Sequence, residues 1–193
     1  MNGNPSSPRQ RIALSFVAAI AALIAIYMGL YQWGLIDHVW DPLFGNSTEK
    51  ILSSDLSHQF RKWLLIPDAV LGAISYLGDI LFSLAGSKSR WKDRPWLVLL
   101  FGAYVIPPAA VSMILVALQG TVLKAWCFLC LVSAATSLFL ILLSYNEVKV
   151  SIVYLYRVWK QSQSKRLVWN TLWGNPSEIA FEVSEHMEKD HVG

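Results

Sequence analysis

Four long apolar runs dominate this sequence and decide what kind of fold it can adopt. They cover residues 12–36, 67–84, 95–118 and 122–143. A helix rises about 1.5 Å per residue, so roughly 20 residues cross the roughly 30 Å hydrocarbon core of a bilayer. The whole chain is 54% hydrophobic and only 15% charged, whereas soluble domains carry about 25% charged residues. We therefore predict an all-α integral membrane protein with a four-transmembrane-helix bundle.

The ends of these runs carry signals that start or stop helices. Arg9 and Arg11 precede the first run, as in a signal peptide, but the run is too long for one and offers no small-residue cleavage site. Pro67 suits the start of the second helix. Pro107 and Pro108 should kink or split the third. We therefore expect four spans, the first of them uncleaved.

Basic residues are distributed unequally between the two sides of these spans. One side carries eleven Lys and Arg residues, in the N-terminal flank, the loop between the second and third spans, and the segment after the fourth. The other side carries four, and its long loop, residues 37–66, is rich in acidic residues. Loops rich in Lys and Arg stay in the cytoplasm. Both termini are therefore predicted to be cytoplasmic, with the 37–66 loop facing outward.

The flanking segments divide the chain further. Within 146–161, apolar side chains recur on one helical face and Lys149, Arg157 and Lys160 lie elsewhere, which is typical of a helix on a membrane surface. The end of the chain is acidic, which predicts a loosely ordered tail. The predicted regions are a cytoplasmic N-terminal tail at 1–11, the membrane domain at 12–145, a cytoplasmic interfacial helix at 146–166 and a cytoplasmic tail at 167–193.

The outward loop should contain one short helix. Ser47 or Thr48 can cap it, and Leu52, Leu56 and Phe60 then share an apolar face. That face must rest on something, so the helix either forms a lid over the outer mouth of the bundle or lies on the surface without a part in chemistry.

Several function classes are excluded or weakly supported. No basic stripe interleaved with aromatic residues is present, so no nucleic-acid partner is expected. The chain has two cysteines, too few for a disulfide-rich domain, and no further ligands at the spacing of a zinc site. His186 and His191 in the tail are interpreted as solvated residues rather than metal ligands. We therefore expect no metal and look to the cysteines and the membrane for function.

The two cysteines are spaced as Cys127-x-x-Cys130 near the predicted outer end of the fourth span. On a helix, residues three apart share a face, which lets two cysteines cycle between dithiol and disulfide. The helix start and Lys124 favour thiolate at Cys127, which we expect to meet aqueous partners, while Cys130 lies a turn deeper where a lipid-soluble oxidant reaches it. Ordinary buried cysteines at a chance spacing are the alternative.

Three motifs resemble the vitamin K epoxide reductase family. They are Trp126-Cys127-Phe128-Leu129-Cys130 opening the fourth span, Ile66-Pro67-Asp68-Ala69-Val70-Leu71-Gly72-Ala73-Ile74-Ser75-Tyr76 opening the second, and Trp40-Asp41-Pro42-Leu43-Phe44-Gly45-Asn46 in the outward loop. The last resembles bacterial members, which implies a multi-pass protein of a bacterial inner membrane. The resemblance runs from about residue 12 to 145.

This resemblance implies a four-helix bundle around a quinone, ubiquinone or menaquinone. In the family, the membrane cysteine pair reduces the quinone, and a pair in the outward loop relays electrons from a thioredoxin-like partner. By motif position, Cys130 resembles the cysteine that meets the quinone and Cys127 the one that exchanges with the relay pair. Asp68 stands where many members have a quinone-binding Asn. Tyr76 and Trp126 are further candidates to line the quinone ring, although ordinary bundle or interface contacts suit them equally.

The sequence departs from the family pattern in its outward loop. The loop holds no cysteine, and Trp40 and Thr48, or residues close to them, stand where the relay pair is expected. An intramolecular relay is therefore impossible. Either a partner thiol attacks the Cys127–Cys130 disulfide directly, or the chain is a catalytically inactive membrane binding or assembly module. Asp79, an ionisable residue within the second span, is either a proton carrier or a carboxyl satisfied by neighbouring hydroxyls.

Overall fold

The computed structural model describes residues 6–54, 57, 62 and 65–192, with side chains as far as Glu188. Every regular element in these residues is helical, in agreement with the predicted all-α class. The elements are α1 (Pro8–Gln32), α2 (Ser47–Leu52), α4 (Asp68–Leu84), α5 (Arg90–Asp93), α6 (Pro95–Leu118), the π-helical turn η1 (Gln119–Leu123), α7 (Phe128–Ser162), α8 (Lys165–Leu172) and α9 (Glu178–Val192).

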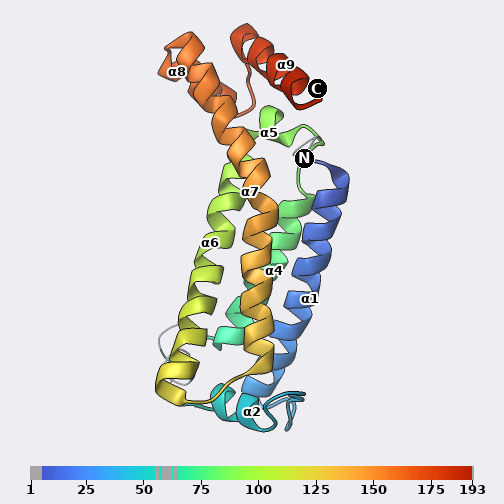
Figure 1. Ribbon diagram of the computed structural model, residues 1–193, viewed down its shortest axis with the longest axis vertical. Coiled ribbons are helices and arrows are strands. Elements are labelled where there is room, and N and C mark those ends of the chain that lie inside the picture. The colour runs from blue at the N-terminus through green and yellow to red at the C-terminus, as the bar shows by residue number, and fades with distance from the viewer. Residues whose placement is uncertain (1–5, 55–56, 58–61, 63–64, 193) are drawn as a thin grey trace.

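Four long helices, α1, α4, α6 and α7, run side by side along the molecule (Figure 1). Helix α2 lies at one end of them, close to the start of α7, and we name this the cysteine end. Helices α5, α8 and α9 lie at the other end, where α1 also begins, and we name this the termini end. Both ends of the chain therefore lie on the same side of the long helices.

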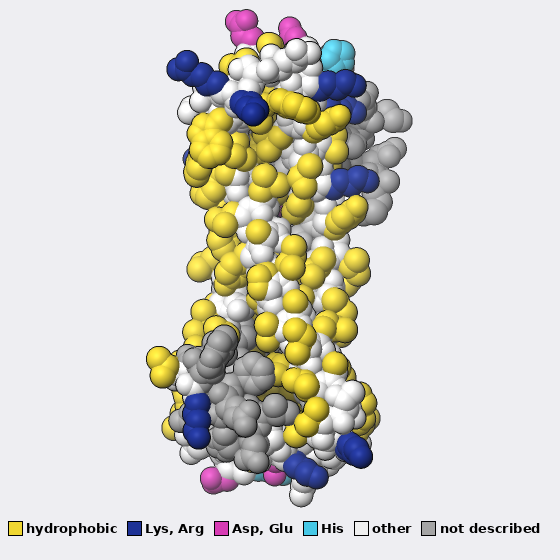
Figure 2. Space-filling model, turned by 90° about the vertical axis from the view of Figure 1, so that its left-hand side faces the viewer, with side chains coloured by type: hydrophobic (Ala, Val, Ile, Leu, Met, Phe, Trp, Pro, Cys, Tyr) yellow, Lys and Arg dark blue, Asp and Glu magenta, His cyan; other side chains and the backbone are white. Residues whose placement is uncertain are grey.

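Three helical stretches are long and apolar enough to cross a membrane. They span Pro8–Gln32, Pro95–Leu123 and Phe128–Ser162 in the part of the chain that the structure describes. Helix α4, with 17 residues, lies at the short limit of about 17–25 residues for a membrane span. Figure 2 shows hydrophobic side chains along the middle of the visible face and charged side chains gathered toward its two ends. This distribution is that of a multi-pass membrane protein.

The boundaries of α1, α4 and α6 follow the first three predicted runs, but the fourth prediction was wrong at both ends. Helix α7 begins at Phe128 rather than near 122, because Lys124 adopts a left-handed conformation (φ 47°) and the chain then extends to Cys127. It continues without a break to Ser162, so residues 146–162 are not a separate interfacial helix. No Gly or Pro interrupts this stretch, which explains its continuity. Helix α6 likewise runs through Pro107 and Pro108 without being split.

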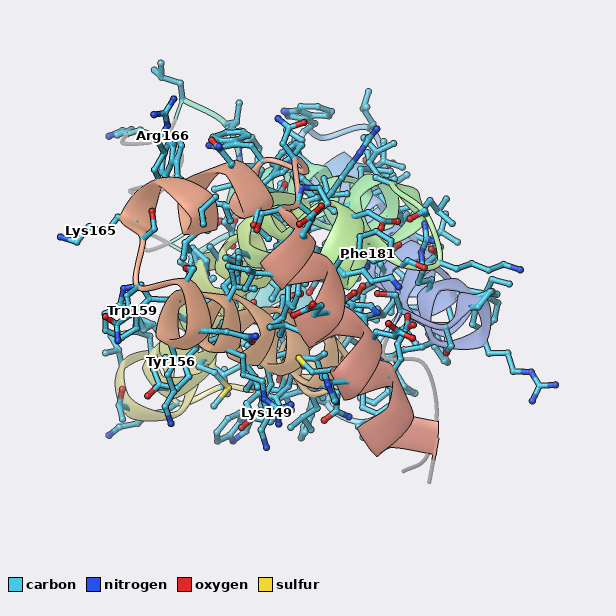
Figure 3. All side chains as sticks on the ribbon, turned by 90° about the horizontal axis from the view of Figure 1, so that it is seen from above. Lys149, Tyr156, Trp159, Lys165, Arg166 and Phe181 are labelled. Atoms are coloured by element: carbon cyan, nitrogen blue, oxygen red, sulfur yellow. A yellow bond between two sulfur atoms is a disulfide. The ribbon has the colours of Figure 1, made fainter. Side chains whose placement is uncertain are left out.

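The end of the chain is ordered, contrary to the prediction of a loose tail. Ala180, Val183 and Met187 of α9 are buried in one cluster with Tyr154 and Val158 of α7. Their spacing of three and four residues marks one helical face, a signal that the acidic composition of the segment concealed. Looking down on the termini end, Figure 3 shows Lys149, Tyr156 and Trp159 of α7 and Lys165 and Arg166 of α8 at its periphery; all five are exposed.

Two arginines cap the carbonyl end of α4 at the termini end. Arg90 donates to the carbonyl oxygens of Phe82, Ser83 and Ala85, at 2.6, 3.3 and 2.9 Å. Arg11 donates to the Ser83 carbonyl at 2.8 Å and also reaches those of residues 84, 85 and 87. The carbonyls that end a helix have no partner within it and attract cations. Arg11 therefore joins the start of α1 to the end of α4, and Arg90 joins α5 to the same end of α4.

The arginine cluster is completed by a buried ion pair. Arg90 and Glu147 of α7 are 0% and 1% exposed, and they form two hydrogen bonds of 2.6 and 2.7 Å, one from Nε and one from Nη2. Ser6 also donates to the Glu147 carboxylate. The pair ties α7 to α5, and through Arg90 to the end of α4.

Candidate functional site

Cys127 and Cys130 form a disulfide at the start of α7, with their Cα atoms 5.2 Å apart. Cys127 is the residue that caps the helix, in an extended conformation (φ −110°, ψ 113°), and its sulfur accepts a hydrogen bond from the Cys130 N–H at 3.1 Å. Cys130 lies in the first turn. The spacing therefore brings the sulfurs together as predicted, although only Cys130 is helical.

The two sulfurs differ in burial, in the opposite sense to the prediction. Cys127 is 0% exposed and belongs to a buried cluster with Val39, Ile51 and Leu52, whereas Cys130 is partly exposed. Val39, Ile51 and Leu52 belong to residues 33–54, the described stretch that follows α1 on the way to α4, which we name the α1–α4 connection. Because this connection covers Cys127, the prediction that Cys127 faces water was wrong. Lys124, which was predicted to favour the Cys127 thiolate, precedes the helix and is exposed, and its effect on the thiol stays a prediction.

Cys130 lines a cavity at the cysteine end, between the long helices and α2. Its volume is about 100 Å³, compared with the roughly 10–15 Å³ that one water molecule needs on this measure, so it has room for a ring-sized group. The lining is mostly apolar and comes from α1, α2, α4, α6, η1 and α7. Its residues are Ala25, Met28, Ile51, Leu52, Ser54, Ser57, Asp68, Ala69, Gly72, Tyr76, Ser112, Leu115, Leu118, Gln119, Leu123, Cys130 and Ser133.

Two of the three predicted ring-lining residues meet Cys130 in this cavity. Asp68 and Tyr76 line it, but Trp126 does not. Trp126 is 42% exposed, and its indole packs so closely over Gly120 that a Cβ there would lie 2.9 Å from the ring. Leu52 of the predicted apolar face lines the same cavity, together with Ile51, and the lid itself stays a prediction. Leu56 and Phe60, the rest of the predicted apolar face, lie outside the described residues.

The polar groups of the cavity are held in defined positions. The Tyr76 hydroxyl donates to the Ser133 carbonyl at 2.9 Å and lies 2.8 Å from Ser137 Oγ. Asp68 accepts from Gln32 Nε2 at 2.6 Å, and the Gln32 oxygen accepts from the Ala69 N–H at 3.3 Å. Gln32 thus orients the Asp68 carboxyl at the start of α4. Sequence reasoning missed Gln32, because only the fold brings the end of α1 to the start of α4.

Ser133 carries a hydroxyl that has no partner. Ser133 is 8% exposed and lines the cavity, and its Oγ makes no hydrogen bond within the part of the chain described by the structure. A buried hydroxyl without a partner is costly, by roughly 1–3 kcal/mol. Ser133 is therefore a candidate to bind a polar group within the cavity. Sequence reasoning missed this role, because a serine in a membrane helix commonly marks close packing of helices.

Asp41 links the α1–α4 connection to the start of α7. Its carboxylate accepts from the Leu43 and Phe44 N–H groups at 2.9 and 2.8 Å, from the Thr48 hydroxyl, and from the Phe128 N–H at 3.4 Å. Partial burial raises the pKa of the Asp41 carboxyl, but the hydrogen bonds outweigh it and leave the pKa below its ordinary value. The charged form of Asp41 is therefore favoured beside the cysteine pair.

Two expectations concerned residues outside this cavity. Asp79 is 3% exposed, does not line the cavity, and has one carboxyl oxygen without a partner among the described residues. Its role as a proton carrier stays a prediction. No group of His, Cys, Asp or Glu suited to a metal ion is found in the described part of the chain, and the side chain of His191 lies outside it.

The comparison with protein families decides the identity of this architecture. The model of the vitamin K epoxide reductase family matches residues 12–145, more than half of the chain. The chain belongs to the vitamin K epoxide reductase family. Comparison with curated proteins gives no match. Vitamin K epoxide reductase relatives couple thiol–disulfide chemistry to quinones in membranes and generally work with a thioredoxin-like partner. The matched region ends inside α7, so α8 and α9 lie outside the family domain.

Proposed function

We propose that this chain is a membrane thiol oxidoreductase whose Cys127–Cys130 pair passes electrons from an external thiol protein to a quinone. The observation that carries the proposal is the meeting of Cys130 with an apolar cavity that also holds Asp68, Tyr76 and the unpartnered Ser133 hydroxyl. An apolar pocket with a few fixed polar groups is the usual form of a site for a small organic ligand. A quinone head group, with its flat ring and two carbonyls, has this chemistry.

Thiol exchange is the first half of the proposed reaction. A thiolate of the partner attacks the Cys127 sulfur, the Cys127–Cys130 bond breaks, and Cys130 leaves as a thiolate. A second thiol of the partner then attacks the mixed disulfide, so the partner leaves oxidised and the pair is left as a dithiol. Because the chain has no relay cysteines, the partner meets the pair directly. Cys127 is buried, so the α1–α4 connection must move away before this attack.

Reoxidation of the pair is the second half. A bound quinone supplies the oxidising equivalents: two S–H bonds are lost, one S–S bond forms, and two electrons and two protons leave as quinol. Cys130 is the cysteine that lines the cavity and therefore the one proposed to face the quinone. Ser133 supplies a hydroxyl toward a ring carbonyl, and Asp68 does so when protonated, whereas Tyr76, whose hydroxyl donates to the Ser133 carbonyl, lines the ring. Trp126 lies outside the cavity, so the proposal replaces it with Ser133.

The proposed topology has four membrane crossings, with α4 as the shortest. Both ends of the chain lie at the termini end, as an even number of crossings requires. The exposed Lys149, Lys165 and Arg166 also lie there, which favours this end as cytoplasmic under the positive-inside rule. The cysteine end would then face the outside of a bacterial inner membrane, where disulfides persist.

Steady-state turnover of the purified protein tests the proposal. In lipid nanodiscs with a dithiol donor, the protein should reduce a ubiquinone or menaquinone analogue, and Cys127→Ser and Cys130→Ser should each lower the rate to background. Thr136→Val is a matched control, since Thr136 lies on α7 outside the cavity and, among the described residues, its hydroxyl bonds to the Val132 carbonyl alone. Full activity in Cys130→Ser would refute the mechanism.

A binding or assembly module without turnover is the second candidate, and the missing relay cysteines favour it. The redox state of the pair in cells, read by the mobility shift after alkylation, separates the two. A pair that cycles with the supply of quinone supports the enzyme. A pair that stays fully reduced under oxidising growth supports the module.

A further inference from the structure

Asp41 stands out among the residues not used in the proposed reaction, because it touches the helix turn that carries the cysteines. One of its oxygens accepts from the Leu43 and Phe44 N–H groups and stays within the α1–α4 connection. The other accepts from the Thr48 hydroxyl and from the Phe128 N–H at the start of α7. Asp41 is therefore a bridge between the connection and the residue that follows Cys127.

Backbone N–H groups at the start of α7 donate to two acceptors that carry negative charge or partial negative charge. The first N–H groups of a helix have no partner within it and favour negative charge nearby. Asp41 occupies the Phe128 N–H at 3.4 Å, and the Cys127 sulfur occupies the Cys130 N–H at 3.1 Å. A carboxylate already at this position opposes a second negative charge on the Cys127 sulfur. The helix start therefore stabilises a Cys127 thiolate less than it would without the Asp41 carboxylate.

The same contact holds the cover over Cys127. Thr48 is 0% exposed and joins Asp41 to the beginning of α2, and Ile51 and Leu52 of α2 are buried in one cluster with Cys127. Glu49 supports the connection from within, since it accepts from the Val39 N–H at 2.9 Å and contacts His38, and it makes no hydrogen bond to α7 among the described residues. Among these carboxylates, Asp41 alone contacts the cysteine-bearing helix within the described residues.

We infer that Asp41 is a positioning residue that sets the reactivity of Cys127, both by latching the α1–α4 connection over it and by placing a negative charge at the start of α7. In this chain a set of hydrogen bonds, Thr48 to Asp41 to Phe128, connects the loop to the cysteine pair where no loop cysteine is available. This inference goes beyond the proposed function, since it concerns the pair itself and holds whatever oxidant or partner the pair meets.

Other ionisable groups at the cysteine end must be considered with Asp41. The described ones come from α1, the α1–α4 connection, α4 and the residues before α7. They include Tyr27, Tyr31, Asp37, His38, Glu49, Lys50, Asp68 and Lys124. Glu49 offers the best matched control, because it is a carboxylate in the same connection that bonds to the Val39 N–H and has no hydrogen bond to α7 among the described residues.

Alkylation of Cys127 as a function of pH tests the inference. The full chain carrying Cys130→Ser, in nanodiscs and under a thiol-free reductant, leaves Cys127 as the one thiol, and its rate of reaction with a maleimide is measured from pH 6 to 10. Adding Asp41→Asn should raise the rate at neutral pH several-fold and move the midpoint of the profile to lower pH, because the opposing charge is gone. Adding Thr48→Val should raise the rate at every pH with the midpoint unchanged, since it opens the latch but keeps the charge.

Three outcomes would overturn the inference. The first is an Asp41→Asn profile identical to that of the parent. The second is a faster rate with an unmoved midpoint, which would reduce Asp41 to a structural contact. The third is an equal midpoint shift in Glu49→Gln, which would assign the effect to the whole connection. An Asp41→Glu variant, which keeps the charge, should retain the parent midpoint. None of these readouts needs quinone turnover, so a failed proposed function leaves the test intact.

Discussion

The two ends of the long helices are held by opposite charges that meet opposite helix termini. At the termini end, Arg11 and Arg90 bind the carbonyls that end α4. At the cysteine end, Asp41 binds an N–H that begins α7. Both arrangements follow the polarity of the helix, which is negative at its carbonyl end and positive at its amide end. At each end, a charged side chain therefore binds a helix terminus of opposite partial charge.

The two ends differ in how deeply their charged groups are buried and in how short the hydrogen bonds of these groups are. Arg90 and Glu147 are excluded from water and joined by two short hydrogen bonds. Asp41 is partly exposed, and its bond to α7, at 3.4 Å, is the longest that it makes. A saturated buried pair is costly to disturb, whereas a partly exposed contact opens with little free energy. The Arg90–Glu147 contact at the termini end should therefore stay closed. The Asp41 contact with α7 at the cysteine end can open, which would release the α1–α4 connection from Cys127.

The largest expected effect comes from breaking the buried Arg90–Glu147 ion pair at the termini end. Glu147→Gln keeps the shape of the side chain but leaves Arg90 buried without its counter-ion, which should lower the free energy of unfolding by about 3–5 kcal/mol. Unfolding of the variant in detergent, followed by helical circular dichroism, measures this loss.

An exposed ion pair at the same end supplies the control. Lys92 and Glu188 are joined at 2.6 Å, but Glu188 is 48% exposed, so Glu188→Gln should cost less than about 1 kcal/mol. Equal losses in Glu147→Gln and Glu188→Gln would contradict the claim that burial makes the Arg90–Glu147 pair costly to break.

A smaller effect is expected in the cavity, where two neighbouring hydroxyls differ. Tyr76→Phe removes a hydroxyl with two partners and should cost about 1 kcal/mol of stability, or somewhat more if Ser137 is left unsatisfied. Ser133→Ala removes a buried hydroxyl that has no partner among the described residues, so it should raise stability by roughly 1–3 kcal/mol while raising the KM for a quinone analogue. A large loss of stability in Ser133→Ala, with an unchanged KM, would count against the role assigned to that hydroxyl.

The smallest expected effect is a pH dependence of the cysteine end. The pKa of Asp41 is below its ordinary value because hydrogen bonds to Thr48 and to backbone N–H groups outweigh its partial burial. A lowered pKa means that Asp41 contributes stability above the unfolded value of about 3.9, and that this contribution is lost as pH falls through the lower folded value. The connection should therefore stay latched at neutral pH and loosen only in strong acid.

Cleavage by pepsin at the exposed Leu43 and Phe44 measures this release. The ratio of cleavage rates between Asp41→Asn and the parent removes the pH dependence of pepsin itself. The ratio should exceed one near pH 5 and approach one near pH 2. A ratio that is constant across this range would show that the Asp41 charge does not hold the connection.

The sequence was sufficient where local pattern decides the structure. Apolar runs located α1, α4 and α6, and the spacing of Cys127 and Cys130 predicted that their sulfurs meet. The position of Asp68 and Tyr76 beside Cys130 followed from the order of the family motifs. The start of α7 was missed because Lys124 adopts its left-handed conformation without being a Gly, and no Gly or Pro stands between Lys124 and Phe128.

Contacts between distant segments could not be predicted. The bond from Phe128 to Asp41 joins residues 87 positions apart, and the burial of Cys127 depends on a loop that packs only in the finished fold. For the same reason Gln32 and Ser133 acquired their roles only with the structure, since one orients Asp68 and the other has no partner.

A single-turnover measurement tests the central claim most directly. Protein in nanodiscs is reduced, freed of reductant, and mixed without oxygen with one equivalent of a quinone analogue, and quinol and free thiols are counted together. The account predicts one quinol formed and two thiols lost per chain, with a Cys127–Cys130 disulfide found by peptide mapping and neither change in Cys130→Ser. Thiols that persist while the quinone stays oxidised would contradict it.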